Sequence, residues 1–209
     1  VYLDRFDTAG QANGHYFHQD LYVAREIYAR KPRRHLDVGS SIYGFVSHVA
    51  SFRDIEVVDI RPLDVKTPGI SFVQLDLMNI DDRPAVTADS VSCLHALEHF
   101  GLGRYGDPVD YDGWRKGLHG LKSILEPNGV LYLSVPTGSE QRVEFNAHRI
   151  FSLPFLRDYL QEMFQLEACA FVDDSGDFHR DVDPWGESAN ASFGANYGLS
   201  IWILKKGSG

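Results

Sequence analysis

One stretch decides the fold that the sequence predicts: His35-Leu36-Asp37-Val38-Gly39-Ser40-Ser41-Ile42-Tyr43-Gly44. Its first four residues have a short strand pattern, and small residues then lead into a helical pattern over Ile42–Phe52. A second apolar strand follows at Ile55–Ile60 and is broken by Pro62. This order of strand, turn, helix and strand is typical of a parallel sheet covered by helices.

The rest of the chain continues the alternation. Further strands are expected at Ile70–Leu77, Ser90–Leu94, Val130–Val135, Leu166–Val172 and Leu199–Lys205, and helices at Asp20–Arg30, Tyr111–Leu125 and Leu153–Met163. The fold class is therefore α/β: a Rossmann-like, mostly parallel, seven-stranded sheet with helices on both faces. One domain over residues 1–206 is expected, in which residues 1–34 cover the ligand site, and residues 207–209 fit a linker or tag remnant.

Composition excludes several classes of protein. The 209 residues include 20 Lys and Arg against 29 Asp and Glu, so a net charge of −9 disfavours a nucleic-acid partner. The apolar runs are too short to span a membrane, and two cysteines give neither a disulfide framework nor a thiolate metal site. We expect a soluble cytoplasmic protein, and a homodimer or a domain of a larger protein both stay open.

Polar side chains follow the predicted strands, where a sheet of this kind binds its ligands. Asp37, Gly39, Ser40 and Gly44 surround the first turn, and further acids stand at the ends of the next two strands. A nicotinamide site needs Gly-x-Gly-x-x-Gly, but this turn lacks the middle glycine. Because Asp37 would repel a pyrophosphate, it suits a ligand with a positive group, such as the amino group of a methionine moiety.

From these residues onward the sequence resembles the class I S-adenosylmethionine-dependent methyltransferases, whose first motif is acidic-x-Gly-x-Gly-x-Gly. The resemblance spans Leu36 to Lys205, with Ser41 where the middle glycine is usual. It implies S-adenosyl-L-methionine as the cofactor, with His95 as a further contact. The implied binding residues are Asp37, Gly39, Ser40 and Gly44 at the methionine end, Asp59 and Ile60 at the ribose, and Asp76 and Leu77 at the adenine.

A narrower resemblance points to the acceptor. His15–Leu21, Leu94–Phe100 and Glu144–Arg149 are similar to a bacterial methyltransferase-like family of unknown function that is associated with surface-polysaccharide gene clusters. This resemblance implies O-methylation of a saccharide or a sugar-derived intermediate. The acceptor is then expected between the N-terminal segment and two long loops, Phe100–Asp110 and Asp173–Tyr197.

Catalytic candidates follow the fourth predicted strand. His95, Glu98 and His99 fall at i, i+3 and i+4, so one helical turn brings them to one face, and His148 could join from the next strand end. A hydroxyl acceptor needs a general base or a metal ion to remove its proton. The pattern is similar to the Glu-x-x-Glu-His plus His site of metal-dependent small-RNA 2′-O-methyltransferases, with His95 in place of the first Glu.

Three interpretations of these residues stay open. They could hold a divalent metal ion through His95, Glu98, His99 and His148, supply a metal-free base from His95 or His99, or be structural. The alternatives for the whole chain are a methyltransferase that acts on another small metabolite, a non-catalytic cofactor-binding or interaction module, and a nicotinamide oxidoreductase.

Overall fold

The computed structural model describes residues 9–80 and 84–208. The first eight residues of the expected N-terminal segment, residues 81–83 of the polar loop before the fourth predicted strand, and Gly209 of the expected tail lie outside this part. In chain order the elements are α1 His15–Arg30, β1 His35–Val38, η2 Ile42–Val46, α2 Ser47–Ala50, β2 Ile55–Asp59, β3 Ile70–Gln74, β4 Ala88–Leu94, η3 Leu97–His99, α3 Gly113–Ile124, β5 Leu125–Thr137, β6 Arg142–Glu144, β7 His148–Ile150, α4 Leu153–Gln161, β8 Gln165–Val172, β9 Phe178–His179, η4 Glu187–Gly194 and β10 Gly198–Lys205.

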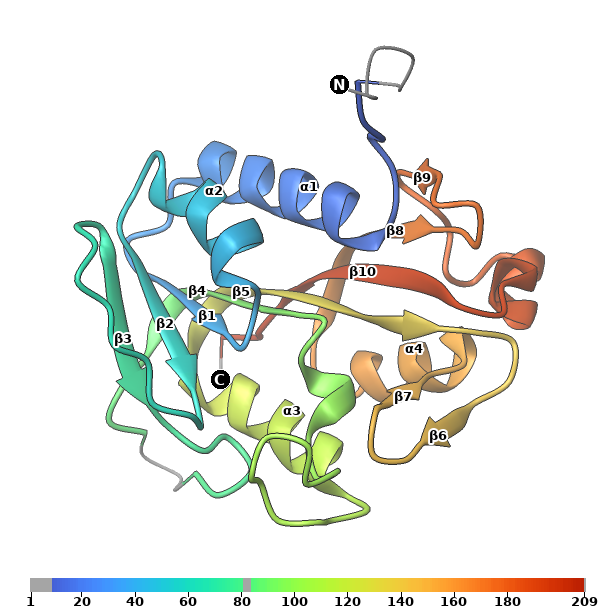
Figure 1. Ribbon diagram of the computed structural model, residues 1–209. Coiled ribbons are helices and arrows are strands. Elements are labelled where there is room, and N and C mark those ends of the chain that lie inside the picture. Colours follow the sequence, from blue (N-terminus) through green and yellow to red (C-terminus); the bar gives the residue numbers. More distant parts are fainter. Residues whose placement is uncertain (1–8, 81–83, 209) are drawn as a thin grey trace, which may run out of the picture.

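A central sheet divides the molecule into layers (Figure 1). Its strand order is β3-β2-β1-β4-β5-β10-β8-β9. The neighbouring strands β3, β2, β1, β4 and β5 all run parallel, and β10 is antiparallel to both β5 and β8. This is the predicted mostly parallel α/β architecture. In the view of Figure 1, α1 and α2 lie above the sheet, while α3 and α4 lie below it.

Each face of the sheet has its own hydrophobic core. The upper core packs Val23 and Ile27 of α1 against sheet residues such as Ile201. The lower core packs Leu118 of α3 and Leu156 of α4 against the opposite face. Burial on both faces explains why the parallel strands have nearly continuous apolar sequences.

The strand count is a correction, because the described residues form eight strands in this sheet and not seven. The additional strand, β9, lies in the long Asp173–Tyr197 loop and pairs with β8. The carboxylate of Asp173 accepts hydrogen bonds from the backbone N–H groups of Ser175 and Asp177, which fold the chain back. A two-residue strand leaves no periodic pattern for sequence analysis to detect.

Several other elements differ from the predictions, among them β5, which spans Leu125–Thr137 and not only Val130–Val135. The helix expected over Ile42–Phe52 is divided into the π-helical turn η2 and the short α2, and the strand expected to reach Leu77 ends at Gln74. Helix α1 begins at His15, before the predicted start at Asp20, and ends at Arg30, after which Lys31 adopts a left-handed φ of 49°. The hairpin of β6 and β7 was not predicted. Within the described residues, no helix combines the length and apolarity needed to cross a membrane.

Candidate functional site

The site lies at the carboxyl ends of the parallel strands and is built around two cavities that share His95. The strand-end cavity is lined from β1 to β4 and by the loop after η3, and the loop cavity is lined by the N-terminal segment and the loop after β8. The strand-end cavity comprises Val38, Gly39, Val58, Asp59, Ile60, Arg61, Leu75, Asp76, Leu77, Met78, His95, Ala96, His99, Phe100, Tyr105 and Asp107. The loop cavity comprises Asn13, Gly14, His15, Tyr16, His95, Asp173, Asp174, Ser175, Gly176 and Tyr197.

The cofactor residues expected from the sequence divide into two sets. Six of them line the strand-end cavity: Gly39, Asp59, Ile60, Asp76, Leu77 and His95. Gly39 adopts φ 68°, and a Cβ there would lie 3.1 Å from the Cβ of Ala96. This glycine therefore allows the turn after β1 to approach the segment after β4 closely. The other three expected residues, Asp37, Ser40 and Gly44, are not part of the lining.

Asp37 faces the interior of the sheet. Its Oδ1 atom accepts hydrogen bonds from the hydroxyls of Ser40 at 2.7 Å and Ser92 at 2.5 Å, and Oδ2 accepts one from the backbone N–H of Ser40 at 3.2 Å. The ring nitrogens of His35 contact Ser90 Oγ at 2.8 Å and Ser92 Oγ at 3.1 Å. Burial raises the pKa of Asp37 to about 6 and lowers that of His35 to about 3. These five residues are called the sheet network below.

Asp59 has an ion-pair partner that the sequence analysis missed. The guanidinium of Arg61 donates to Asp59 from Nε at 3.0 Å and from Nη2 at 2.7 Å, and lies 4.2 Å from the ring centre of Tyr105. The signal was in the sequence, since Arg61 follows Asp59 by two positions at a strand end. Asp59 and Tyr105 therefore both fix the position of Arg61 at the rim of the strand-end cavity.

His95 and Glu98 form a hydrogen-bonded pair in which Nδ1 of His95 lies 2.7 Å from Oε1 of Glu98. A carboxylate can only accept, so Nδ1 carries the proton and Nε2 presents a lone pair. Nε2 lies 3.2 Å from Nδ1 of His15, and the ring of Tyr16 stacks on His95 at a centroid distance of 4.8 Å. His95 has a left-handed φ of 53°, which turns the chain out of β4. The side chain of Glu98 is 1% exposed.

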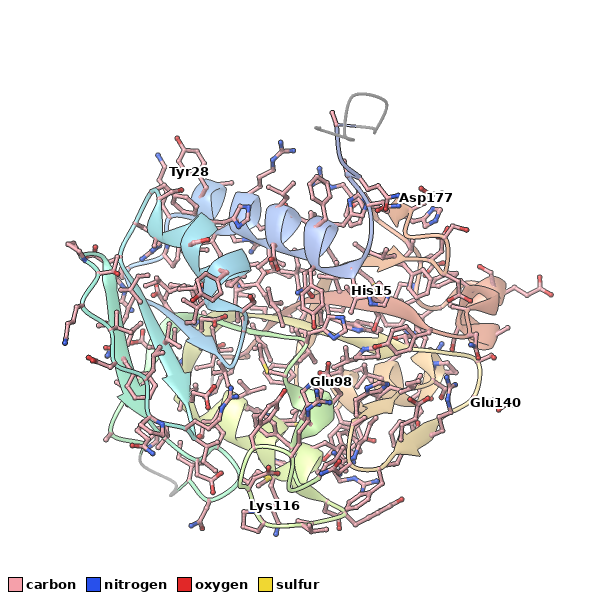
Figure 2. All side chains as sticks on the ribbon, in the orientation of Figure 1. His15, Tyr28, Glu98, Lys116, Glu140 and Asp177 are labelled. Atoms are coloured by element: carbon pink, nitrogen blue, oxygen red, sulfur yellow. The ribbon has the colours of Figure 1, made fainter. Side chains whose placement is uncertain are left out.

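The neighbouring His99 points differently. Its Nδ1 donates to the carbonyl oxygen of Ala147 at 2.7 Å, so its Nε2 has the lone pair, 3.7 Å from Oε1 of Glu98. Burial lowers the pKa of His99, which favours this neutral form. The 3₁₀ turn of η3, in place of the expected α-helical turn, brings these residues together. His15, His95, Glu98 and His99 are called the strand-end cluster below, and Figure 2 labels two of them, His15 and Glu98.

His148 adjoins this cluster from β7. Its ring centre lies 6.5 Å from that of His99, and its Nε2 lies 3.3 Å from a carboxylate oxygen of Glu144. Across residues 9–80 and 84–208, no three His, Cys, Asp or Glu residues are grouped so that they could hold a metal ion. Nδ1 of each ring is already within hydrogen-bond distance of a protein oxygen, on Glu98 for His95 and on Ala147 for His99. The arrangement is therefore not that of the four-ligand metal site considered from the sequence.

Arg149 is a second residue whose role the sequence analysis missed. Its buried guanidinium donates to the backbone carbonyl oxygens of Glu98, Phe100, Asp110 and Tyr111 at 2.5 to 3.4 Å. It thereby ties both ends of the glycine-rich loop to β7. The residue belongs to the quoted Glu144–Arg149 motif, but carbonyl partners distant in the sequence cannot be identified from the motif itself.

The lining of the strand-end cavity combines apolar and acidic side chains. Ile60 and Leu77 are apolar, and Asp59 and Asp76 are acidic. Among the residues that the structure describes, no lysine lines the cavity, and the arginine that does, Arg61, is bound to Asp59. A pyrophosphate would find acids where it needs donors.

Comparison with known proteins identifies the family. A family model described as "Caenorhabditis protein of unknown function, DUF268" matches residues 51–165, more than half of the chain. The chain belongs to the DUF268 family. The DUF268 description names no activity and no link to surface polysaccharides. No curated protein sequence matches this DUF268 chain.

Solved structures share the fold of this DUF268 protein. The N-methyltransferase NodS from Bradyrhizobium japonicum, in complex with S-adenosyl-L-homocysteine, has a TM-score of 0.59 at 12% identity, over 99% of this chain and 93% of NodS. The 1,6-didemethyltoxoflavin-N1-methyltransferase of Burkholderia thailandensis, with bound 1,6-didemethyltoxoflavin and S-adenosylhomocysteine, has a TM-score of 0.57 at 16% identity, over 90% of this chain and 78% of that one. An O-methyltransferase family protein from Burkholderia thailandensis has a TM-score of 0.53 at 10% identity, over 95% and 64% of the respective chains. The fold is thus the Rossmann-like fold of S-adenosylmethionine-dependent methyltransferases.

Proposed function

We propose that this protein is an S-adenosylmethionine-dependent methyltransferase that methylates a hydroxyl of a saccharide or a sugar-derived intermediate in surface-polysaccharide biosynthesis. The observation that carries the proposal is the position of His95, which lines both the strand-end cavity and the loop cavity. A group transferred from a ligand in one cavity to a ligand in the other passes beside this imidazole. Two structures of this fold with S-adenosylhomocysteine support the choice of donor.

The strand-end cavity receives the donor. Asp59 accepts the ribose hydroxyls, and the apolar side chains of Ile60 and Leu77 enclose the adenine, with Asp76 beside it. When bound, S-adenosylmethionine supplies an electrophilic methyl group on a sulfonium. Gly39 and His95 line this cavity, and His95 also lines the loop cavity. Alignment of donor and acceptor in such an enclosed site contributes a large part of the acceleration of a transfer reaction.

His95 acts as the general base. Nε2 of His95 accepts the proton that the acceptor hydroxyl loses during attack. In the structure Nδ1 of His15 lies beside this nitrogen, and the acceptor hydroxyl takes that place when it binds. Glu98 is a positioning residue: it holds Nδ1–H of His95, fixes the tautomer and stabilises the positive ring after proton transfer. Burial and the neighbouring His95 lower the pKa of His15 to about 4, so His15 stays neutral and places no positive charge beside the base.

The loop cavity receives the acceptor. The rings of Tyr16 and Tyr197 offer flat apolar faces for a sugar ring, and Asp173, Asp174 and Ser175 offer polar atoms for hydroxyls. The surface-polysaccharide context rests on the resemblance of the sequence motifs. Methylation of another small metabolite is the alternative, favoured by the N-methyltransferases that share the fold.

Isothermal titration with S-adenosylhomocysteine tests the donor. We expect binding by the wild type and a 10- to 100-fold weaker Kd for Asp59→Asn, since a hydrogen bond to a charged group contributes about 1.5–3 kcal/mol. Asp64→Asn is the matched control, because the Asp64 side chain is 81% exposed and pairs with Lys66. This control variant should bind like the wild type.

Two results would reject the donor proposal. One is a wild type that does not bind S-adenosylhomocysteine, and the other is a wild type that binds NAD instead. Turnover then separates an enzyme from a binding module: methyl transfer from labelled donor to saccharide extracts is expected. Binding without transfer to any saccharide or small-metabolite fraction would favour the module.

A further inference from the structure

Asp20 of α1 is a buried carboxylate without a cationic partner. It is 4% exposed, and Oδ1 accepts a hydrogen bond from the side-chain amide of Gln19 at 3.1 Å. Within the described residues, no Lys, Arg or His lies within ion-pair distance of it, and no hydrogen-bond donor reaches Oδ2. Burial raises its pKa to about 6. Since burying an unpaired charge is costly, such a group is a candidate for ligand binding.

The turn after β1 holds this carboxylate close to the strand-end cavity. Oδ2 of Asp20 lies 2.5 Å from the position that a Cβ on Gly44 would take, so a side chain at residue 44 would displace it. The same turn begins at Gly39, which lines the strand-end cavity. Asp20 is also near enough to His95 for the imidazole to act on its pKa. Asp20 itself lines neither cavity; Gly44 of the turn and the charge of His95, which lines both cavities, connect it to the site.

Asp37, the acid that the sequence analysis assigned to the methionine end, has less capacity for a ligand. Both of its oxygens accept hydrogen bonds from Ser40 or Ser92, three bonds in all. Asp20 has one such bond, from Gln19. Of the roughly four acceptor positions on a carboxylate, Asp20 therefore keeps more free than Asp37 does.

We propose that Asp20 binds the α-ammonium group at the amino-acid end of the donor. This inference rests on the proposed function. An ammonium group has three N–H donors and a full positive charge, which match the vacant acceptor positions and the charge of Oδ2. Pairing with a ligand cation offsets the free-energy cost of burying the carboxylate. Because residue 44 is a glycine, the Asp20 carboxylate has room beside the turn.

A ligand pair isolates this contact. S-Adenosylhomocysteine has the ammonium group, and 5′-methylthioadenosine has the same nucleoside thioether without the amino-acid end. For Asp20→Asn we expect 10- to 100-fold weaker binding of S-adenosylhomocysteine and a change of less than about 3-fold for 5′-methylthioadenosine, because the amide keeps the shape and loses the charge. Glu26→Gln is the control on the same helix, since Glu26 pairs with Arg30 near the surface.

A modified ligand removes the same contact without any change to the protein. The butyrate analogue of S-adenosylhomocysteine lacks only the amino group. The wild type should bind this analogue 10- to 100-fold more weakly than S-adenosylhomocysteine, which is the same loss that we expect for S-adenosylhomocysteine on Asp20→Asn. The two losses should not add, because each removes the same contact. Equal affinity of wild type and Asp20→Asn for S-adenosylhomocysteine would overturn the inference and leave the proposed function intact. Failure of the wild type to bind either nucleoside would overturn the proposed function itself.

The pH dependence provides an independent readout. Wild-type affinity for S-adenosylhomocysteine should fall as pH drops below about 6, because protonation of Asp20 removes its charge. The charges of His48 of α2, His95 after β4 and Asp37 of β1 also interact with this carboxylate. Asp20→Asn retains those three residues, so the part of the profile that the substitution removes belongs to Asp20. A profile that Asp20→Asn leaves unchanged would contradict the inference.

Discussion

The sheet network and the strand-end cluster both contain histidine and both involve β4, yet they differ in burial and in what their rings face: all five sheet-network residues are buried, whereas His15, His95 and His99 of the strand-end cluster are half-buried. His35 of the sheet network contacts serine hydroxyls through both nitrogens and is 2% exposed. His95 of the strand-end cluster uses one nitrogen on Glu98 and turns the other toward His15 and the loop cavity. Both nitrogens of each ring have partners, so the difference lies in the surroundings: neighbouring strands enclose His35, whereas His95 and its partner His15 line the loop cavity, where a ligand can reach them.

Position along the strands produces this difference. His35 lies within β1, opposite Ser90 of β4, so neighbouring strands enclose its ring. His95 follows the last residue of β4, where a positive φ turns the chain away from the sheet. Parallel strands place such residues at one edge, where the connecting loops leave space for ligands.

The largest expected effect is on the rate of methyl transfer in His95→Gln. Glutamine keeps a hydrogen-bonding side chain but cannot take up the proton, so the rate with a hydroxyl acceptor should fall about 10²- to 10⁴-fold. Binding of S-adenosylhomocysteine should change less than about 3-fold. The rate is measured by transfer from labelled donor, with the exposed His119→Gln of α3 as control. Full activity in His95→Gln would assign the base to another group.

The second expected effect is on the stability of the protein and not on the rate of methyl transfer, and it concerns His35. His35→Leu leaves the hydroxyl of Ser90 without its ring partner, so we expect a loss of about 1–3 kcal/mol in the free energy of unfolding and an unchanged rate of transfer. Adding Ser90→Ala removes the second partner and should recover part of that loss. Urea unfolding measures both variants. A rate that falls with His35→Leu while the protein stays folded would remove the distinction between the two networks.

The strand ends were predictable from the sequence, but several partners of the site residues were not. Asp59 and Ile60 follow an apolar run that ends at Pro62, so local pattern alone puts them at the edge of the sheet. The environment of Asp37 depends on Ser92, which comes from β4 and is distant in the sequence. Only the register of β1 against β4 brings these two residues together, and a one-residue shift would turn Ser92 to the other face.

The same limit applies to the catalytic candidates. The i, i+3, i+4 spacing predicts one helical turn for His95, Glu98 and His99, whereas the structure has a 3₁₀ turn over Leu97–His99 with His95 before it; Glu98 still lies within 2.7 Å of His95 and 3.7 Å of His99. The spacing did not predict which nitrogen each ring leaves free, since the carbonyl of Ala147 and the ring of His15 come from distant segments. Tautomers depend on those tertiary contacts, and so does the choice between a metal site and a base.

The smallest expected effect is a pH dependence that belongs to His35. Burial lowers its folded-state pKa to about 3, below the unfolded value of 6.5, so the unfolded chain binds the extra proton between these two pH values. Its contribution to stability is therefore complete above pH 6.5 and is lost as pH falls toward 3. His15 acts in the same direction, whereas Asp20 and Asp37, with raised pKa values, act in the opposite one between pH 3.8 and 6. The difference between wild type and His35→Leu cancels those groups, and it should narrow by about 1 kcal/mol between pH 7 and about pH 5.5. Unfolding in urea at both pH values measures it, and a difference that stays constant or widens on acidification would mean that the His35 ring takes up a proton inside the sheet.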